Sequence, residues 1–166
     1  MIYFSSAKNI EIYRFIRHDF ETEKVDLSSV VNDVVSRLSY QRKDINLDLK
    51  LINVNAMINE GQLSVAIENV LTNQLRYAKS KIEISMDSAH KNSMVKLRFA
   101  NDGEKIDEDK LVNLFKPFEK SVSGENGLGL YIAKKIIELH GGEIKIKNEE
   151  SFVATVIKIP VLPDTD

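Results

Sequence analysis

The sequence predicts an α/β fold, a two-layer sandwich in which one mixed or antiparallel sheet is covered on one face by helices. Stretches that alternate apolar and polar residues, as half-buried strands do, come in hairpin-like pairs along the chain. Stretches with apolar residues at three- and four-residue spacing, as in helices, separate these pairs. Elements in this order are expected to pack as two layers around one core.

The first part of the chain predicts a helix followed by strands. Residues 1–24 mix aromatic and charged side chains and predict a short helix or an irregular lead-in. Asp26 is placed to cap a helix that runs to about Tyr40. Residues 45–51 alternate as a strand does, and residues 53–59 are a candidate second strand.

A longer helix and two further strand pairs follow. Gly61 is expected in a turn before a helix over residues 62–79. The later elements are expected to be strands at 81–86 and 94–100, a short helix at 107–115, a polar loop at 116–126, a helix after a glycine-rich segment, and strands at 143–147 and 152–159. Pro160 and the acidic tail are expected to end the fold.

Composition is that of an ordinary globular domain. The 166 residues fit one domain, with 43% hydrophobic and 29% charged residues. A net charge of −2 argues against a strongly basic nucleic-acid surface, so we expect no nucleic-acid partner. The absence of cysteine excludes disulfides and thiolate metal sites. No apolar run reaches membrane-spanning length, which leaves open that the chain is a piece of a larger membrane protein.

The glycine-rich segment from Gly124 to Leu130 is the strongest sign of chemistry. Gly124, Gly127 and Gly129 crowd into six positions directly before a helical pattern. Glycine lets the backbone approach a ligand closely, and the start of a helix offers N–H groups and positive potential. The segment therefore predicts a phosphate-binding site.

Polar side chains at two other places point to a nucleotide. At about 100° per residue, the helix at 62–79 carries Asn69, Asn73, Arg76 and Tyr77 beside its apolar stripe. An asparagine oxygen can bind Mg²⁺ that carries substrate phosphates, an arginine can meet phosphate oxygens, and a tyrosine can lie against a base. At the end of a strand, the segment Asn101-Asp102-Gly103 can accept a hydrogen bond from the amine of a base.

These segments stand in an order that resembles the ATP-binding catalytic domain of bacterial two-component sensor histidine kinases, in the superfamily (GHKL) shared with gyrase, mismatch-repair ATPases and heat-shock chaperones. Residues 67–78 look like the N box of that family, and residues 101–106 look like its first glycine box. Residues 114–118 look like its F box, and residues 124–130 look like its second glycine box. The resemblance spans residues 25 to 160 and implies a Bergerat-type ATP-binding fold.

The resemblance implies a role for each matching residue, with ATP and Mg²⁺ as cofactors. Asn73 matches the Mg²⁺-coordinating asparagine, and Asn69 matches a second asparagine that faces the nucleotide. Arg76 and Lys120 match basic residues that reach the phosphates, and Tyr77 matches the aromatic residue beside adenine. The other expected nucleotide-binding residues are Asn101, Asp102, Gly103, Ile106, Phe115, Gly127, Leu128, Gly129 and Leu130.

The chain departs from the family pattern at three positions. Asn101 stands where the family has the aspartate that reads adenine, and either Asn101 or the adjacent Asp102 can be the reader. Lys105 replaces the second glycine of that box, so the local turn is in question. Gln74 replaces a frequent alanine, and the sequence offers no reason for it.

Position 69 bears on the reaction. Hydrolases of the superfamily have there a glutamate that activates water, whereas Asn69 cannot act as a base. The resemblance therefore implies transfer of the γ-phosphate to a histidine, without acid–base catalysis by this chain. His18 lies too close to the expected domain to belong to a two-helix acceptor. Two alternatives remain, namely a non-catalytic nucleotide-sensing module and an ATPase of the same superfamily.

The resemblance also implies partners and a location. The expected partners are a histidine-bearing dimerisation domain of the same parent protein and a response regulator. The parent is expected to be a membrane-bound homodimer with this domain in the cytoplasm. Residues 1–24 are then a lead-in from the dimerisation region, residues 25–161 the ATP-binding domain and residues 162–166 a flexible tail.

Overall fold

The structure is a computed structural model that describes residues 14, 16–17, 20–89, 93–117 and 127–163. Along the chain its elements are β1 (Glu23–Asp26), α2 (Leu27–Leu38), a 3-10 helix η1 (Ser39–Arg42), β2 (Asn46–Lys50), β3 (Asn55–Ile58), α3 (Glu60–Tyr77), β4 (Lys81–Ala89), β5 (Met94–Asn101), α4 (Glu108–Leu111), α5 (Gly129–Leu139), β6 (Glu143–Asn148) and β7 (Val153–Pro160).

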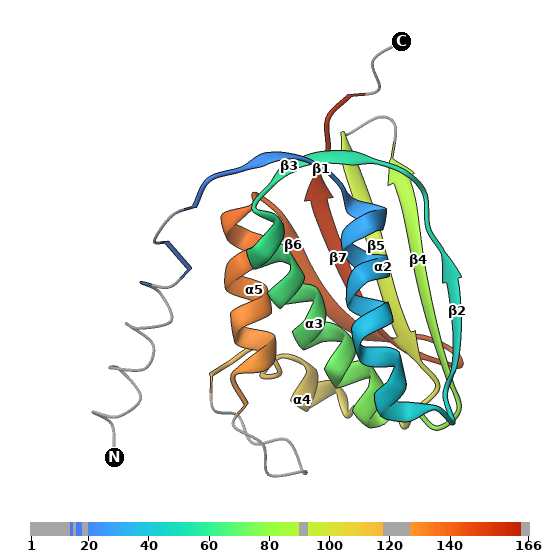
Figure 1. The fold of residues 1–166 in the computed structure, drawn as a ribbon. Helices are drawn as coiled ribbons and strands as arrows, with labels where there is room; N and C mark the ends of the chain where they lie inside the picture. The colour runs from blue at the N-terminus through green and yellow to red at the C-terminus, as the bar shows by residue number, and fades with distance from the viewer. Residues whose placement is uncertain (1–13, 15, 18–19, 90–92, 118–126, 164–166) are drawn as a thin grey trace.

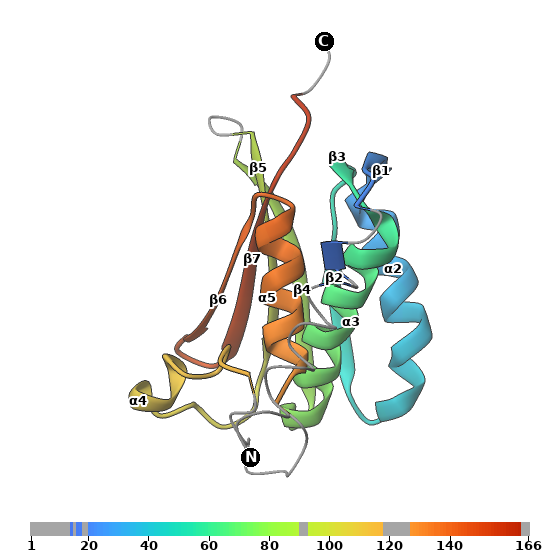
Figure 2. The same cartoon turned by 90° about the vertical axis from the view of Figure 1, so that its left-hand side faces the viewer.

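Five strands form the main sheet in the order β2-β4-β5-β7-β6. β2 runs parallel to β4, and the other neighbours are antiparallel, so the sheet is mixed. α2, α3 and α5 lie side by side over one face of this sheet (Figure 1). The view turned by 90° shows the same helices on one side of β6 and β7 (Figure 2). The predicted two-layer sandwich with a mixed sheet is therefore confirmed.

The core lies between the sheet and the helices. On β4, Ile82 and Ile84 are buried, whereas Glu83 between them points to the opposite face and is only partly covered. On α3, the buried side chains fall at the expected three- and four-residue spacing, and the helix packs against both α2 and α5. α3 thus occupies the middle of the helical layer, and its polar flank lies near α5.

The predicted hairpin-like pairing of residues 45–51 with residues 53–59 is wrong. β2 pairs with β4, and β3 pairs with β1 in a separate two-stranded sheet. The chain between β2 and β3 is held by the start of α2, because Leu27 N donates to Val54 O at 2.9 Å and Val54 N donates to Asp26 Oδ1 at 3.3 Å. These contacts with the start of α2 place residues 53–54 away from a hairpin turn, so tertiary contacts decide the pairing.

The lead-in segment contacts the rest of the fold. Ile16 is buried in the core, and its carbonyl accepts a hydrogen bond from Gln62 Nε2 at 2.8 Å. Residues 23–26 form β1, a strand that the sequence analysis missed. Its four residues, Glu-Lys-Val-Asp, are too few and too charged to show a strand pattern.

The two long helices begin at side-chain caps. Asp26 caps α2 as predicted, with Oδ1 accepting from Ser28 N at 3.0 Å. The placement of Gly61 in a turn is wrong, because Gly61 is the second residue of α3. Asn59 caps that helix two residues earlier than expected, with Oδ1 accepting from Gln62 N at 3.0 Å.

Two later boundaries also differ from the predictions. The predicted short helix over residues 107–115 is limited to α4, and single turns follow it. β7 ends at Pro160, opposite Met94, one residue beyond the predicted strand end at residue 159. Among the described residues, no helix is both long enough and apolar enough to cross a bilayer.

Candidate functional site

The N-box segment lies on the polar flank of α3. Asn69, Asn73 and Arg76 are half-buried beside the apolar stripe, and Tyr77 is 40% exposed at the end of the helix. The Arg76 guanidinium carbon lies 5.9 Å from the centre of the Tyr77 ring, within range of a cation–π contact. The four residues therefore lie on α3 where solvent reaches at least part of each of them.

Asn69 meets the glycine-rich segment across the gap between α3 and α5. Its Nδ2 donates to Val65 O at 2.9 Å, which fixes the direction of the amide. Its Oδ1 lies 2.9 Å from the position that a Cβ atom on Gly129 would occupy. Any larger residue at position 129 would displace the Asn69 side chain, so these two predicted residues are in direct contact.

The start of α5 has the features of an anion site. Gly127 adopts a φ of +61°, which glycine tolerates best, and the helix begins at Gly129. Leu128 is the N-cap residue, and its side chain makes no capping hydrogen bond. Leu128 has no polar side-chain atom to cap the first N–H groups of α5, and these groups lie at the positive end of the helix dipole, near Asn69.

Asn101 is buried behind Gly103. The residue is only 2% exposed, and its Nδ2 donates to Gln74 Oε1 at 2.8 Å. Its Oδ1 accepts from Gly103 N at 2.9 Å. A Cβ atom on Gly103 would stand 2.2 Å from Tyr77 O, so only glycine fits between β5 and the end of α3.

Asp102 has a different environment from Asn101. Its carboxylate accepts from Lys79 N at 2.9 Å, from Ser80 N at 3.0 Å and from Ser80 Oγ at 2.6 Å. Burial opposes its ionisation, but the hydrogen bonds from Ser80, Lys81 and Lys79 hold the pKa of Asp102 well below its ordinary value. Asp102 therefore holds the turn that joins α3 to β4.

The loop after Gly103 is fixed by a residue that the sequence analysis did not select. Asn148, at the end of β6, accepts from Ile106 N at 3.0 Å and donates to Ile106 O at 2.7 Å. Lys105 is exposed beside this contact. A side chain in place of the usual glycine therefore points outward, and the loop keeps a defined path through Asn148.

The F-box segment connects to α5. Phe115 packs against the main core, and Lys134 Nζ of α5 lies 5.6 Å from the centre of its ring. Lys120, predicted to reach phosphates, lies outside the described residues, as do residues 118–126 as a whole. Leu130 is half-buried in the first turn of α5.

The described part of the site has no candidate general base. Glu68, next to Asn69, lies on another side of α3, where its Oε2 is 3.2 Å from Arg37 Nη1 of α2. No group of three or more acidic or histidine side chains suited to hold a metal occurs among the described residues. The described residues of the predicted site offer the amide oxygens of Asn69 and Asn73 as possible ligands of a metal ion.

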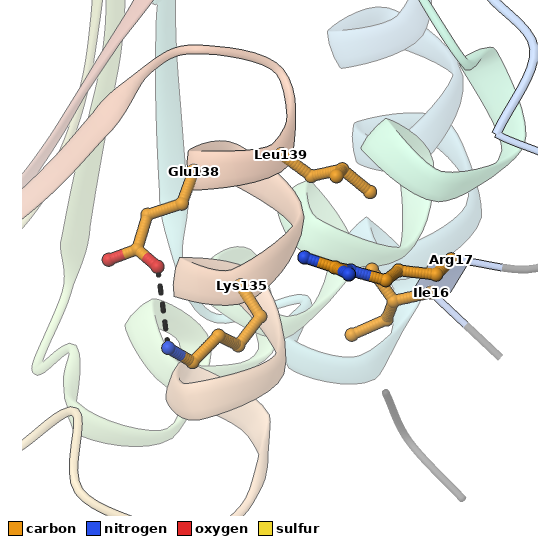
Figure 3. Close-up of a pocket in the computed structure, with 5 residues that line it drawn as sticks. All are labelled: Ile16, Arg17, Lys135, Glu138 and Leu139. Atoms are coloured by element: carbon orange, nitrogen blue, oxygen red, sulfur yellow. Dashed lines mark hydrogen bonds and ion pairs between the residues drawn. The ribbon is translucent and has the colours of Figure 1, made fainter. Parts of the chain in front are cut away.

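A shallow pocket of about 190 Å³ lies elsewhere, between the lead-in segment and α5. Figure 3 shows Ile16 and Arg17 beside Leu139, whereas the charged ends of Lys135 and Glu138 turn to the other side of α5. These two charged ends form an ion pair of 3.4 Å. None of the predicted site residues lines this pocket.

Comparisons with known proteins agree on one family. Residues 58–164 match the family described as histidine kinase-, DNA gyrase B- and HSP90-like ATPase. The sensor histidine kinase CssS of Bacillus subtilis (strain 168) is 34% identical over 146 residues, which is 87% of this chain and 31% of CssS. The heme sensor protein HssS of Staphylococcus aureus (strain Newman) is 28% identical over 145 residues, which is 84% of this chain and 31% of HssS.

Solved structures share the fold. The mycobacterial sensor histidine kinase MprB superposes with a TM-score of 0.79 at 23% identity, covering 86% of this chain and 99% of that one. A nucleotide-free catalytic domain of the histidine kinase ThkA superposes with a TM-score of 0.76 at 25% identity, covering 86% of this chain and 97% of that one. The chain spans less than a third of its curated relatives but nearly the whole of these structures.

Proposed function

Because the chain belongs to the family of histidine kinase-, DNA gyrase B- and HSP90-like ATPases, we propose that it binds Mg²⁺-ATP and presents the γ-phosphate to a histidine on a separate dimerisation domain. The observation that carries this proposal is the contact between Asn69 of α3 and Gly129, the first residue of α5. It joins the N box and the second glycine box at one place, where a polyphosphate would meet amide oxygens and helix N–H groups.

The base would lie toward the end of α3. Asn101 is the better candidate to read adenine, because each carboxylate oxygen of Asp102 accepts two hydrogen bonds from Lys79 and Ser80, whereas Asn101 Oδ1 accepts one from Gly103 N. Tyr77 is exposed at the same end of the helix and offers a ring for a planar base. Gly103, Ile106 and Phe115 would complete the wall of the base site.

The phosphates would lie toward α5. The backbone of Gly127, Leu128, Gly129 and Leu130 would receive phosphate oxygens, and Arg76 would supply positive charge from α3. Lys120 would serve the same role, because it matches a basic residue that reaches the phosphates in this family. Bound Mg²⁺ would neutralise phosphate charge, and the oxygen of Asn73 would hold it beside the substrate.

Transfer fits this site better than hydrolysis. A neutral amide occupies position 69, and Glu68 is paired with Arg37. No described group near Asn69 can therefore take a proton from water. Positioning and charge neutralisation are sufficient for transfer, in which a histidine nitrogen bonds to the γ-phosphorus as the bond to the β-phosphate oxygen breaks and ADP leaves.

The rest of the signalling system is part of the proposal. Residues 25–161 would be the ATP-binding domain, and residues 1–24 would lead in from the dimerisation region. A response regulator would receive the phosphoryl group, and the parent protein would be a membrane-bound homodimer with this domain in the cytoplasm.

Phosphotransfer in trans tests the proposal. The chain is incubated with radiolabelled ATP and Mg²⁺, with and without the two-helix histidine domain of the parent. We expect acid-labile, base-stable label on the added domain and none on the chain alone, and we expect Asn73→Ala to abolish the label. Release of free phosphate without an acceptor would favour the ATPase, and tight ATP binding with neither outcome would favour a sensing module. Asn46→Ala on the exposed edge of β2 is the control and should leave labelling unchanged.

A further inference from the structure

A chain of hydrogen bonds runs through the core behind the candidate base site. Asn101 Nδ2 donates to Gln74 Oε1 at 2.8 Å, and Gln74 Nε2 donates to Thr155 Oγ1 at 3.1 Å. The three residues are 2%, 1% and 1% exposed and come from β5, α3 and β7. Buried polar groups need partners, and each amide here has them.

The backbone of Gly103 sets the direction of the whole chain. A backbone N–H can only donate, so the atom of Asn101 that lies 2.9 Å from Gly103 N must be its oxygen. The amide nitrogen of Asn101 must then face Gln74, and the Gln74 side-chain oxygen accepts its hydrogen bond. Gln74 consequently turns its amide nitrogen to Thr155.

The orientation matters because an amide has two different ends. A carboxylate at position 101 would present an acceptor in either orientation. An asparagine presents an acceptor only if its amide is prevented from rotating by about 180°. Gln74 and Gly103 oppose this rotation together, since the rotated amide would place the nitrogen of Asn101 against Gly103 N–H and its oxygen against the oxygen of Gln74.

We propose, on the premise that an adenine nucleotide binds as described above, that Gln74 is a positioning residue for base selection. It keeps Asn101 Oδ1 as a fixed acceptor, whose second lone pair takes the hydrogen bond of a 6-amino group. A purine with a 6-oxo group brings a second acceptor to the same place and is rejected. Gln74 touches neither base nor phosphate and acts only through Asn101.

ADP and IDP provide the test, because their bases differ in the 6-amino and 6-oxo groups and the adjoining ring nitrogen. Calorimetry with Mg²⁺ gives both dissociation constants for the wild type, Gln74→Leu, and the double variant Gln74→Leu with Asn101→Asp. We expect the wild type to bind ADP more tightly than IDP. In Gln74→Leu the ratio of the two dissociation constants should fall by about tenfold, which corresponds to the free energy of one hydrogen bond. The double variant should regain the wild-type ratio, since aspartate needs no orientation.

Two comparisons keep a structural effect apart from a positioning effect. Gln62→Leu removes another buried glutamine from α3, one that bonds to Ile16 O, and should leave the preference unchanged. If Gln74→Leu does not fold, Gln74→Met takes its place, because it also removes the amide, and it should lose the preference with Asn101 and keep it with Asn101→Asp. An unchanged preference in Gln74→Leu, or no recovery in the double variant, would overturn the role of Gln74. A wild type that binds neither nucleotide would instead overturn the proposed function.

Discussion

Asn148 holds the backbone of Ile106 at both of its polar groups, with its Oδ1 3.0 Å from Ile106 N and its Nδ2 2.7 Å from Ile106 O. The two residues are 42 positions apart, and the contact ties the end of β6 to the loop after Gly103. This loop carries Lys105 where the family pattern has a glycine, and a residue outside the loop, Asn148, holds its backbone in place.

Replacement of Asn148 should weaken nucleotide binding more than it weakens the fold. Asn148→Ala leaves two backbone groups of a half-buried residue without their partner, at a cost of about 1–3 kcal/mol shared between stability and binding. Titration with ADP should show about tenfold weaker binding, while urea unfolding shows a smaller loss. Asn148→Asp keeps the acceptor for Ile106 N and should fall between. Equal ADP affinity in all three proteins would show that the loop does not need this contact.

Two glycines in helices make a matched pair. Gly129→Ala would bring a Cβ atom within 2.9 Å of Asn69 Oδ1, whereas Gly61→Ala meets nothing closer than 3.7 Å. Alanine favours helix over glycine, so neither change should lower the unfolding temperature much, and Gly61→Ala should raise stability by up to about 1 kcal/mol. Only Gly129→Ala should weaken ADP binding, by about tenfold, because it displaces Asn69. Equal ADP affinity of the two variants would contradict a role of Asn69 in nucleotide binding.

His140 gives the stability of the chain a pH dependence. Its Nε2 accepts from Asn59 N at 3.1 Å, its Nδ1 lies 2.7 Å from Ile136 O, and the ring packs edge-on against Phe20. Burial lowers the pKa of His140, although the hydrogen bond to Ile136 opposes the shift. The unfolded chain therefore takes up a proton near pH 6.5 that the folded chain takes up only at lower pH.

The free energy of unfolding should accordingly fall as pH drops below about 6.5, and it should be insensitive to this group above that value. Urea unfolding at pH 7.5 and pH 5.5 measures the loss. His140→Gln should lose less stability between the two values than the wild type. The same loss with and without His140 would contradict the assignment.

Much of the fold could be predicted because its elements are long and regular. The stripe on α3 and the alternation on β4 and β5 each extend over several buried residues, so their type was predictable from spacing alone. β1 has four residues and no pattern of its own. The pairing of β3 with β1 depends on contacts with the start of α2, which spacing does not encode.

The candidate site was predictable where a motif is local. The segments around Asn69 and Gly129 are each contiguous, and their order along the chain is distinctive. Gln74 had no explanation in the sequence, because its partners lie 27 and 81 residues away on two strands of the sheet. The proposal that Asn101 rather than Asp102 binds adenine likewise rests on the structure, because the sequence does not show that Asp102 bonds to Ser80.

Calorimetry with a non-hydrolysable ATP analogue, with and without Mg²⁺, tests the central claim most directly. The wild type should bind the analogue and bind it more tightly when Mg²⁺ is present. Asn73→Ala should lose most of the gain from Mg²⁺ and keep the affinity measured without it, because only the proposed metal ligand is removed. No binding by the wild type, or an equal gain from Mg²⁺ in both proteins, would contradict a Mg²⁺-ATP site on this face of α3.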